Sequence, residues 1–285
     1  MRNLNKPTIT IIGAGALARV LVLSLHTARY EVREIIARRP ATSQRRAQKL
    51  AKLCNTHAAM VHSAKLDSDV IWMCVPDDAV AEVARELAKR KDIEWRNKSV
   101  VHSSGALPAS VLMPLQERGA SVASAHPMNT FVETSAPTLK GVPFALEGDN
   151  RSVRVVESVV RKLGGEAFRI HAESKPLYHA MGAFASPLYV SLIAAAEEVG
   201  HKAGFKTPRK VMAHILRQTT ENIIWQGTAG AFSGPMKRGD IATLRKHLEV
   251  LRSLPEAIEI YKVLCKNAIH HLPVKNRAAL LKLFI

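Results

Sequence analysis

The stretch from Thr8 to Ala18 constrains the fold of this chain more than any other part of the sequence. It reads TITIIGAGALA, a short β-branched run that ends in glycines, and an apolar segment from Leu17 to Leu25 follows it. This order predicts a strand, a tight turn and a helix. The spacing G-x-G-x-x-A at the turn is that of a dinucleotide-binding turn.

Each small residue of this turn has a physical reason to be there. Gly13 permits the sharp turn out of the strand, and Gly15 lets a pyrophosphate approach the backbone. Ala18 is small enough for the helix and the strand to pack closely. The free N–H groups at the start of the helix then face the phosphates. We therefore predict that the dinucleotide contacts the turn residues Gly13, Ala14, Gly15, Ala16 and Leu17.

Length and composition indicate a globular protein with room for two domains. The chain has 285 residues, of which 47% are hydrophobic. No apolar run reaches the ~20 residues of a membrane span, so we expect no membrane partner. The segment from Met1 to Pro7 lacks the apolar part of a signal peptide, and we expect a cytoplasmic protein.

Cysteine and histidine spacing gives no sign of a metal site. The three cysteines, Cys54, Cys74 and Cys265, are far apart and form no C-x-x-C pair, which is typical of thiols in a reducing compartment. The twelve histidines form no H-E-x-x-H motif. We expect no bound metal.

The net charge of +17 is unusual for a globular chain of this length. Such a surface attracts polyanions, and nucleic acid is one interpretation. However, the lysines and arginines are scattered through predicted helices, and aromatic residues make up only 5%. Solvated helix faces explain this pattern better, so nucleic-acid binding remains the less favoured alternative.

The second predicted strand, residues 31–37, ends in two arginines. NAD-binding units carry an acidic residue near this position, which binds the ribose hydroxyls. Arg38 and Arg39 suit a 2′-phosphate instead, and Arg45 on the next helix is placed to assist them. We therefore predict NADP as the cofactor. Two alternatives remain: solvated arginines, and Glu34 as the ribose partner, although Glu34 lies inside the strand.

Further strand patterns complete a doubly wound, mainly parallel sheet. They cover residues 58–61, 69–76, 99–105, 121–127, 144–147 and 168–170. Pro76 ends one of these strands, and Asp77 or Asp78 is placed to cap the next helix. Ligands bind at the carboxyl ends of such strands. We therefore expect Val75, Pro76 and Asp77 to line the nicotinamide side, with strand ending and helix capping as the alternative. Ser103 and Ser104 would bind the cofactor and His126 the substrate, with turn formation and a structural histidine as the alternatives.

Strand patterns end near residue 171, and helical patterns continue to the carboxyl terminus. We predict helices over residues 174–203, with a kink at Pro187, and over 207–225, 241–251, 255–271 and 276–284. The fold class is thus α/β: an amino-terminal NADP-binding Rossmann domain, residues 1–171, followed by an all-α domain, residues 172–285. The helical domain would contribute to substrate binding and dimerisation, and we expect a homodimer.

Lys175 and His179 are the predicted catalytic pair. They are four residues apart at the start of the first long helix, so they share one helix face. The ammonium would donate a proton to a carbonyl or imine or polarise it, and the imidazole would orient that group or exchange the proton. Tyr178 is an alternative donor. A surface lysine and a packed histidine are the structural alternative.

A second polar cluster lies between residues 233 and 240. Its two glycines and one proline suggest a rigid loop, and Asp240 is placed to cap the next helix. We predict that Arg238 binds a substrate carboxylate or phosphate. Asn222 on the preceding helix is a further substrate-binding candidate, with core hydrogen bonding as the alternative.

Four segments carry a family resemblance: HSSGAL at 102–107, SAHP at 124–127, KPLYHA at 175–180 and SGPMKRGD at 233–240. They resemble uncharacterised Rossmann-like proteins with a carboxyl-terminal helical domain of unknown function. Those proteins are similar to pyrroline-5-carboxylate reductase, deazaflavin-linked NADP reductases and 3-hydroxyacid dehydrogenases with a 6-phosphogluconate-dehydrogenase-like helical domain. By this resemblance Lys175 matches the catalytic lysine of the hydroxyacid enzymes, while His179 replaces their asparagine. Pro187 replaces an asparagine that is frequent in the family.

Together these patterns predict an NADP-dependent oxidoreductase. It would transfer hydride to or from a C=O or C=N group of a small acidic substrate, with the cofactor supplying the hydride chemistry. A non-catalytic dimer that senses a dinucleotide is the alternative, with a basic nucleic-acid-binding protein as the next.

Overall fold

A computed structural model describes residues 6–38, 41–132 and 138–284 of the chain. The chain divides into two compact units, Met1–Gly182 and Ala183–Ile285. The boundary falls inside a helix, after Gly182, whereas the change in sequence pattern lies near residue 171. Each unit is described separately below.

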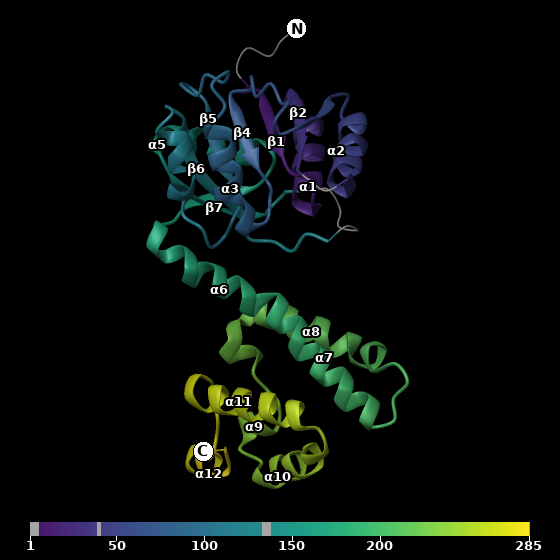
Figure 1. Ribbon diagram of the computed structural model, residues 1–285. Helices are drawn as coiled ribbons and strands as arrows, with labels where there is room; N and C mark the ends of the chain where they lie inside the picture. The colour runs from purple at the N-terminus through teal and green to yellow at the C-terminus, as the bar shows by residue number, and fades with distance from the viewer. Residues whose placement is uncertain (1–5, 39–40, 133–137, 285) are drawn as a thin grey trace. The chain divides into compact units, whose positions relative to one another are not determined.

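The first unit is built on one sheet, eight-stranded in the described part of the chain, with the order β3-β2-β1-β4-β5-β6-β7-β8. Neighbouring strands are parallel except for β6 and β7. The Rossmann-type, mainly parallel sheet predicted from the sequence is therefore confirmed (Figure 1). The strands are β1 (Ile9–Ile12), β2 (Val32–Ala37), β3 (His57–Met60), β4 (Val70–Met73), β5 (Ser99–His102), β6 (Ser121–Pro127), β7 (Pro143–Gly148) and β8 (Glu166–Arg169).

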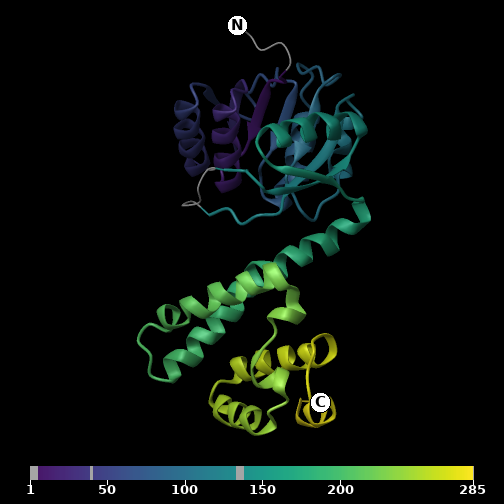
Figure 2. The same cartoon turned by 180° about the vertical axis from the view of Figure 1, so that it is seen from behind.

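Helices cover both faces of this sheet. The helices of the first unit are α1 (Ala16–Thr27), α2 (Ala41–Leu53), α3 (Asp77–Ala88), α4 (Met113–Gln116) and α5 (Asn150–Lys162), with 3-10 turns at Ala109–Leu112 and Ala172–Ser174. One apolar core joins the sheet to α1, α2 and α5, and a second joins it to α3 and α4. Figure 2 shows α5 in front of the sheet on the first of these faces.

The central strand β4 shows why the chain forms this arrangement. Val70 and Trp72 belong to one core, and Ile71 and Met73 belong to the other. All four side chains are buried, as expected for a parallel strand with helices on both faces.

The rest of the chain is helical, as predicted. It comprises α6 (Lys175–Ala185), α7 (Pro187–Lys202), α8 (Pro208–Ala231), α9 (Gly234–Arg238), α10 (Ile241–Val250), a 3-10 turn (Leu251–Ser253), α11 (Pro255–His271) and α12 (Arg277–Phe284). Pro187 ends the continuity of the first long helix: Ser186 is non-helical, and α7 begins anew at Pro187. The segment 233–240 is not a loop as expected, because α9 forms within it.

The apolar character of α6 and α7 corrects one expectation. The helical stretch Ala172–Lys202 is long and apolar enough to cross a membrane, by length and composition alone. No residue of its most apolar window is buried in the structure. A membrane-spanning helix and a helix of a subunit interface both leave apolar side chains exposed in a single chain. The exposed apolar residues of this stretch therefore fit a subunit interface as well as a membrane span.

Candidate functional site

The turn between β1 and α1 has the geometry that its glycines predict. Gly13 has a φ of +113°, and a Cβ atom there would lie 2.2 Å from the carbonyl oxygen of Cys74. No side chain fits between the two backbones, so this position requires glycine. At Gly15 a Cβ atom would meet nothing within 4 Å, and the residue is exposed. The first glycine therefore shapes the turn, and the second keeps open space in front of it.

The backbone N–H groups at the amino terminus of α1 have no capping side chain. Gly15 is the N-cap and makes no side-chain cap bond, and the first turn of α1 contains no acidic residue. Ala14, Ala16 and Leu17 are partly exposed around it. Free N–H groups and the positive end of a helix dipole favour an anion here. The turn thus fits the diphosphate of a dinucleotide.

Arg38 lies where the sequence places it, directly after β2. It lines a cavity of about 390 Å³ at the carboxyl ends of β2 and β3, together with Ala37, Met60, Val61, His62 and three residues of α3, Glu82, Val83 and Glu86. Arg39 lies outside the described residues. Arg45 is exposed on α2. The cavity is therefore lined by one arginine, which suits a 2′-phosphate, and by two carboxylates, which suit ribose hydroxyls.

The loop after β4 is tied to the loop after β5. Val75 is half-buried and Pro76 is exposed at the end of β4. Pro76, and neither aspartate, is the N-cap of α3, which corrects the expected capping role. The carboxylate of Asp77 instead accepts a hydrogen bond from the Ser104 hydroxyl at 2.8 Å. This bond joins two loops that both follow carboxyl strand ends.

The two predicted serines have different surroundings. The Ser103 hydroxyl accepts a hydrogen bond from Nε1 of Trp72 at 2.8 Å, which places it at the edge of the core. Ser104 is buried, and its hydroxyl also accepts from the backbone N–H groups of Ala106 and Leu107. Both bonds fix the loop after β5. Ser104 therefore organises this loop from within.

His102, the last residue of β5, also fixes this loop through its ring nitrogens. Its Nδ1 accepts from the N–H of Ser104 at 3.1 Å, and its Nε2 lies 3.2 Å from the carbonyl oxygen of Pro108. These partners require a neutral ring with the proton on Nε2. Burial is the main cause that lowers the pKa of His102 to about 4, so the neutral ring is the form present near pH 7.

Lys175 is the most buried charged group of the site. Its side chain has no solvent exposure, and its Nζ donates to the Ser124 hydroxyl at 2.7 Å and to the Ser104 carbonyl at 3.1 Å. The Ser124 hydroxyl donates to the same carbonyl at 3.2 Å. Burial lowers the pKa of Lys175, while the charges of Glu147 and Asp77 oppose that shift. The lysine is thus an internal anchor and not a group that projects into open space.

Two histidines and a tyrosine meet beside Gly105. The Tyr178 hydroxyl lies 2.9 Å from Nδ1 of His126, and the rings of His126 and His179 are edge to face with centroids 5.7 Å apart. A Cβ atom on Gly105 would lie 2.6 Å from Cδ2 of His179 and 2.8 Å from Nε2 of His126. The structure therefore brings His126 and His179 together, next to the loop that Lys175 anchors.

The remaining candidates lie in the second unit. Asn222, on α8, accepts a hydrogen bond from the Gln218 side chain at 3.1 Å. Arg238 is exposed at the end of α9. Asp240 caps α10 as predicted, since its carboxylate accepts from the backbone N–H and the hydroxyl of Thr243. Among the described residues, no group of three metal-ligating side chains could hold an ion.

The sequence did not predict several contacts of the site. Asp77 was expected to cap a helix or to line the nicotinamide side, whereas Ser124 and Gly105 were only parts of predicted strands and family motifs. Ser124 is 51 residues from Lys175. Gly105 lies in the loop after β5, whereas His126 belongs to β6 and His179 to α6. The motif segments 102–107, 124–127 and 175–180 were the available signal, because all three meet here.

Comparison with known proteins agrees with this architecture. Among solved structures, a proposed NADP oxidoreductase from Bacteroides fragilis, BF3122, has a TM-score of 0.78 at 21% identity, covering 92% of this chain and 97% of its own. A pyrroline-5-carboxylate reductase from Coxiella burnetii has a TM-score of 0.57 at 16% identity, covering 92% and 98%. A reductive aminase from Aspergillus terreus, in complex with NADPH and ethyl-5-oxohexanoate, has a TM-score of 0.57 at 15% identity, covering 99% and 100%. At these identities the likeness establishes the fold.

Family models account for most of the sequence in two parts. One describes a Rossmann-like domain and matches residues 3–127, and the other describes a domain of unknown function, DUF2520, and matches residues 142–268. No curated protein matches the chain. The chain therefore joins a Rossmann-like domain to a carboxyl-terminal DUF2520 domain, as the sequence resemblance indicated.

Proposed function

We propose that the protein is an NADP-dependent oxidoreductase that transfers hydride to or from a C=O or C=N group of a small acidic substrate. The observation that carries this proposal is the contrast between Gly13 and Gly15. The backbone of Cys74 excludes a side chain at the first, and open space lies in front of the second. A turn built in this way, ahead of an uncapped helix terminus, suits a bound diphosphate.

The solved structures with this fold agree in chemical class. They are named as an NADP oxidoreductase, a pyrroline-5-carboxylate reductase and a reductive aminase in complex with NADPH. Reduction of a C=N bond is common to the last two names. This agreement supports an oxidoreductase, and it favours a carbonyl or imine as the reducible group.

In this proposal the residues of the first unit share the work at the carboxyl ends of the strands. Gly13 to Leu17 hold the diphosphate, Arg38 meets the 2′-phosphate, and Val75 and Pro76 border the nicotinamide. When bound, the nicotinamide supplies the hydride chemistry. Ser104 and Asp77 fix the loop beside it through their hydrogen bond.

The burial of Lys175 changes how it would act. For direct delivery of a proton, its bonds to Ser124 and Ser104 would have to open. We propose instead that it acts as a fixed positive charge under the loop after β5, where it stabilises negative charge that develops on the substrate. His126 and His179 would then face the reacting group. The substrate-binding roles predicted for Asn222 and Arg238 stay predictions.

A cytoplasmic homodimer is the assembly that we propose. The second unit exposes many large apolar side chains, among them Ile215, Ile224 and Trp225, and Trp225 is 84% exposed. A second copy would cover such surface, because exposed apolar side chains of this size are typical of interfaces between chains. Cys54, Cys74 and Cys265 are all free thiols, as in a reducing compartment. Light scattering on the purified protein tests the dimer.

Nucleotide titration tests the cofactor assignment. The binding of NADPH and of NADH is measured by nucleotide fluorescence for the native protein, Arg38→Ala and Lys91→Ala. We expect Arg38→Ala to weaken NADPH binding about tenfold or more and to leave NADH binding unchanged. Lys91, beyond the far end of α3, is the control. Tighter NADH binding by the native protein would indicate that Glu82 or Glu86 binds ribose hydroxyls in the Arg38 cavity.

Turnover is measured with a panel of 2-oxo acids, with and without ammonium, and cyclic imino acids. The decrease in absorbance of the reduced nicotinamide reports hydride transfer. Nucleotide binding without turnover on any member would favour the dinucleotide-sensing alternative. Failure to bind either nucleotide would contradict the proposed function.

A further inference from the structure

A buried tyrosine and a histidine form a pair at the site. The Tyr178 hydroxyl lies 2.9 Å from Nδ1 of His126, and the two rings are edge to face with centroids 5.5 Å apart. Tyr178, on α6, is buried, and His126 near the end of β6 is half-buried. The proposed function gives no role to this contact, although it joins two of the motif segments.

The protonation states of the two groups decide the direction of this hydrogen bond. Burial raises the pKa of Tyr178 to about 12, so the phenol keeps its proton. Burial, followed by the charges of His179 and Lys175, lowers the pKa of His126 to about 4, so its ring is neutral near pH 7. A neutral imidazole has one donor and one acceptor nitrogen.

The phenol proton needs an acceptor, and Nδ1 of His126 is the acceptor within reach among the described residues. When the hydroxyl donates to Nδ1, the ring proton must be on Nε2. The contact therefore selects one of the two tautomers of a neutral histidine.

The position of Nε2 makes this selection relevant to chemistry. It lies next to Gly105, where a Cβ atom would approach it to 2.8 Å. Gly105 follows Ser104, in the loop after β5 that Lys175 and Asp77 hold in place. A donor at Nε2 is thus directed to the same strand-end loop at which the substrate would lie.

We propose that Tyr178 is a positioning residue that holds His126 as the Nε2–H tautomer, so that the neutral imidazole donates a hydrogen bond beside Gly105 to the carbonyl oxygen or imine nitrogen of the substrate. The substrate part of this inference rests on the proposed function, whereas the tautomer does not. A neutral donor of this kind polarises the reacting bond without adding a charge next to Lys175.

The tautomer can be observed directly by long-range nitrogen–proton correlation NMR of the histidine rings near pH 7. His126→Asn assigns the His126 signals. We expect native His126 to be protonated at Nε2, and Tyr178→Phe to change it to a mixture of tautomers, because the phenyl ring keeps the packing but has no proton to donate.

The second unit offers a matched control. There the Tyr261 hydroxyl lies 2.9 Å from Nδ1 of His247, the same pairing as at the site. Tyr261→Phe should change the signals of His247 and leave those of His126 and the turnover unchanged. Signals of His102 that are unchanged in Tyr178→Phe would show that the first unit of this variant is folded, because His102 has its own partners in that unit.

Kinetics test the role in the reaction. With any acid that the panel shows to be reduced, Tyr178→Phe should lower kcat about tenfold to a hundredfold and leave the dissociation constant of NADPH within about twofold. A native His126 protonated at Nδ1, or a tautomer unchanged by Tyr178→Phe, overturns the inference. So does a kcat that stays native when the tautomer is lost. Absence of turnover with the whole panel contradicts the proposed function, and the NMR result then decides the role of Tyr178 separately.

Discussion

The Nζ atom of Lys175 lies 2.7 Å from the Ser124 hydroxyl, and this bond attaches the first turn of α6 to the interior of β6. Both groups also bond the Ser104 carbonyl, so the three close a triangle in which every member is buried. These bonds therefore hold together the loop after β5, the strand β6 and the first turn of α6. A charged group in such a place has both a structural and an electrostatic effect, which substitution can separate.

Lys175→Met removes the charge but keeps most of the side-chain volume. We expect the free energy of unfolding to change by no more than about 2 kcal/mol, because the desolvation cost of a buried ammonium offsets the loss of its hydrogen bonds. Turnover should fall about a hundredfold or more if the charge stabilises the transition state. Urea unfolding and steady-state kinetics measure the two effects.

Lys98→Met is the matched control, since Lys98 is half-buried and likewise donates to a backbone carbonyl, that of Ser68. It should leave turnover and NADPH binding as they are. Native turnover in Lys175→Met would remove this lysine from the reaction.

The two glycines of the β1–α1 turn should respond differently to the same added methyl group. Gly13→Ala places Cβ against the carbonyl of Cys74 at a positive φ, so we expect a loss of stability of about 3 kcal/mol or more, or failure to fold. Gly15→Ala meets nothing and has a φ of −79°, so stability should change by less than about 1 kcal/mol.

For nucleotide binding, Gly15→Ala is the informative variant, because it should leave the protein folded. Because the methyl group of Gly15→Ala points into the space proposed for the diphosphate, NADPH binding should weaken about tenfold or more. Thermal unfolding and fluorescence titration provide the two readouts. Unchanged affinity in a folded Gly15→Ala protein would argue against the diphosphate position.

Acid should destabilise the protein through His102. Its pKa is about 4 in the folded state against an ordinary value of 6.5, so the unfolded chain binds the proton more readily. The stability associated with the neutral ring is complete above 6.5 and is lost as the pH falls to about 4, with a difference of about 3 kcal/mol over this window. Urea unfolding at several pH values measures it.

His102→Asn can still accept from the N–H of Ser104 and has no group that titrates in this range, so its stability should depend less steeply on pH. His171→Asn, at an exposed histidine, should keep the native slope. Equal slopes in all three proteins would show that the acid sensitivity originates elsewhere.

Local rules were sufficient for much of the fold. The predicted helix over residues 255–271 has the observed bounds of α11, because Pro255 occupies the first turn, where its missing N–H costs nothing. Asp240 caps α10 for a similarly local reason. The strand from residue 121 to 127 was also predicted with its observed bounds. Features of this kind depend on neighbours in sequence.

The sequence could not show which distant side chains pair. It identified Lys175 as a proton donor, but the burial of Lys175 depends on two serines more than fifty residues away in the chain. Aspartate is a favoured residue at helix N-caps, yet the carboxylate of Asp77 accepts a hydrogen bond from the Ser104 hydroxyl instead. Predictions failed where a polar side chain had both a local and a long-range partner available, because only the packed structure decides between them.

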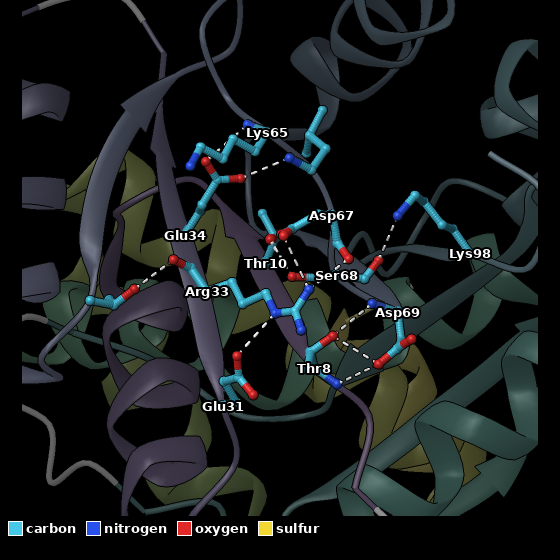
Figure 3. A network of polar contacts seen from close by, with 12 residues as sticks. Thr8, Thr10, Glu31, Arg33, Glu34, Lys65, Asp67, Ser68, Asp69 and Lys98 are labelled. Carbon is cyan, nitrogen blue, oxygen red and sulfur yellow. Dashed lines mark hydrogen bonds and ion pairs between the residues drawn. The ribbon is translucent and has the colours of Figure 1, made fainter. Parts of the chain in front are cut away.

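Glu34 allows a last test, of the alternative in which this carboxylate binds the ribose. It is buried inside β2, and its oxygens accept from the backbone N–H groups of Lys65 and Leu66 at 2.9 Å (Figure 3). Glu34→Gln should lower the free energy of unfolding by about 2 kcal/mol, since one of two charge-assisted acceptors is replaced by a donor. The dissociation constants of NADPH and NADH should not change, because both carboxylate oxygens are already occupied by the chain. Chemical unfolding and nucleotide titration of this variant give the comparison, and a selective loss of NADH binding would restore Glu34 as the ribose partner and argue against Arg38.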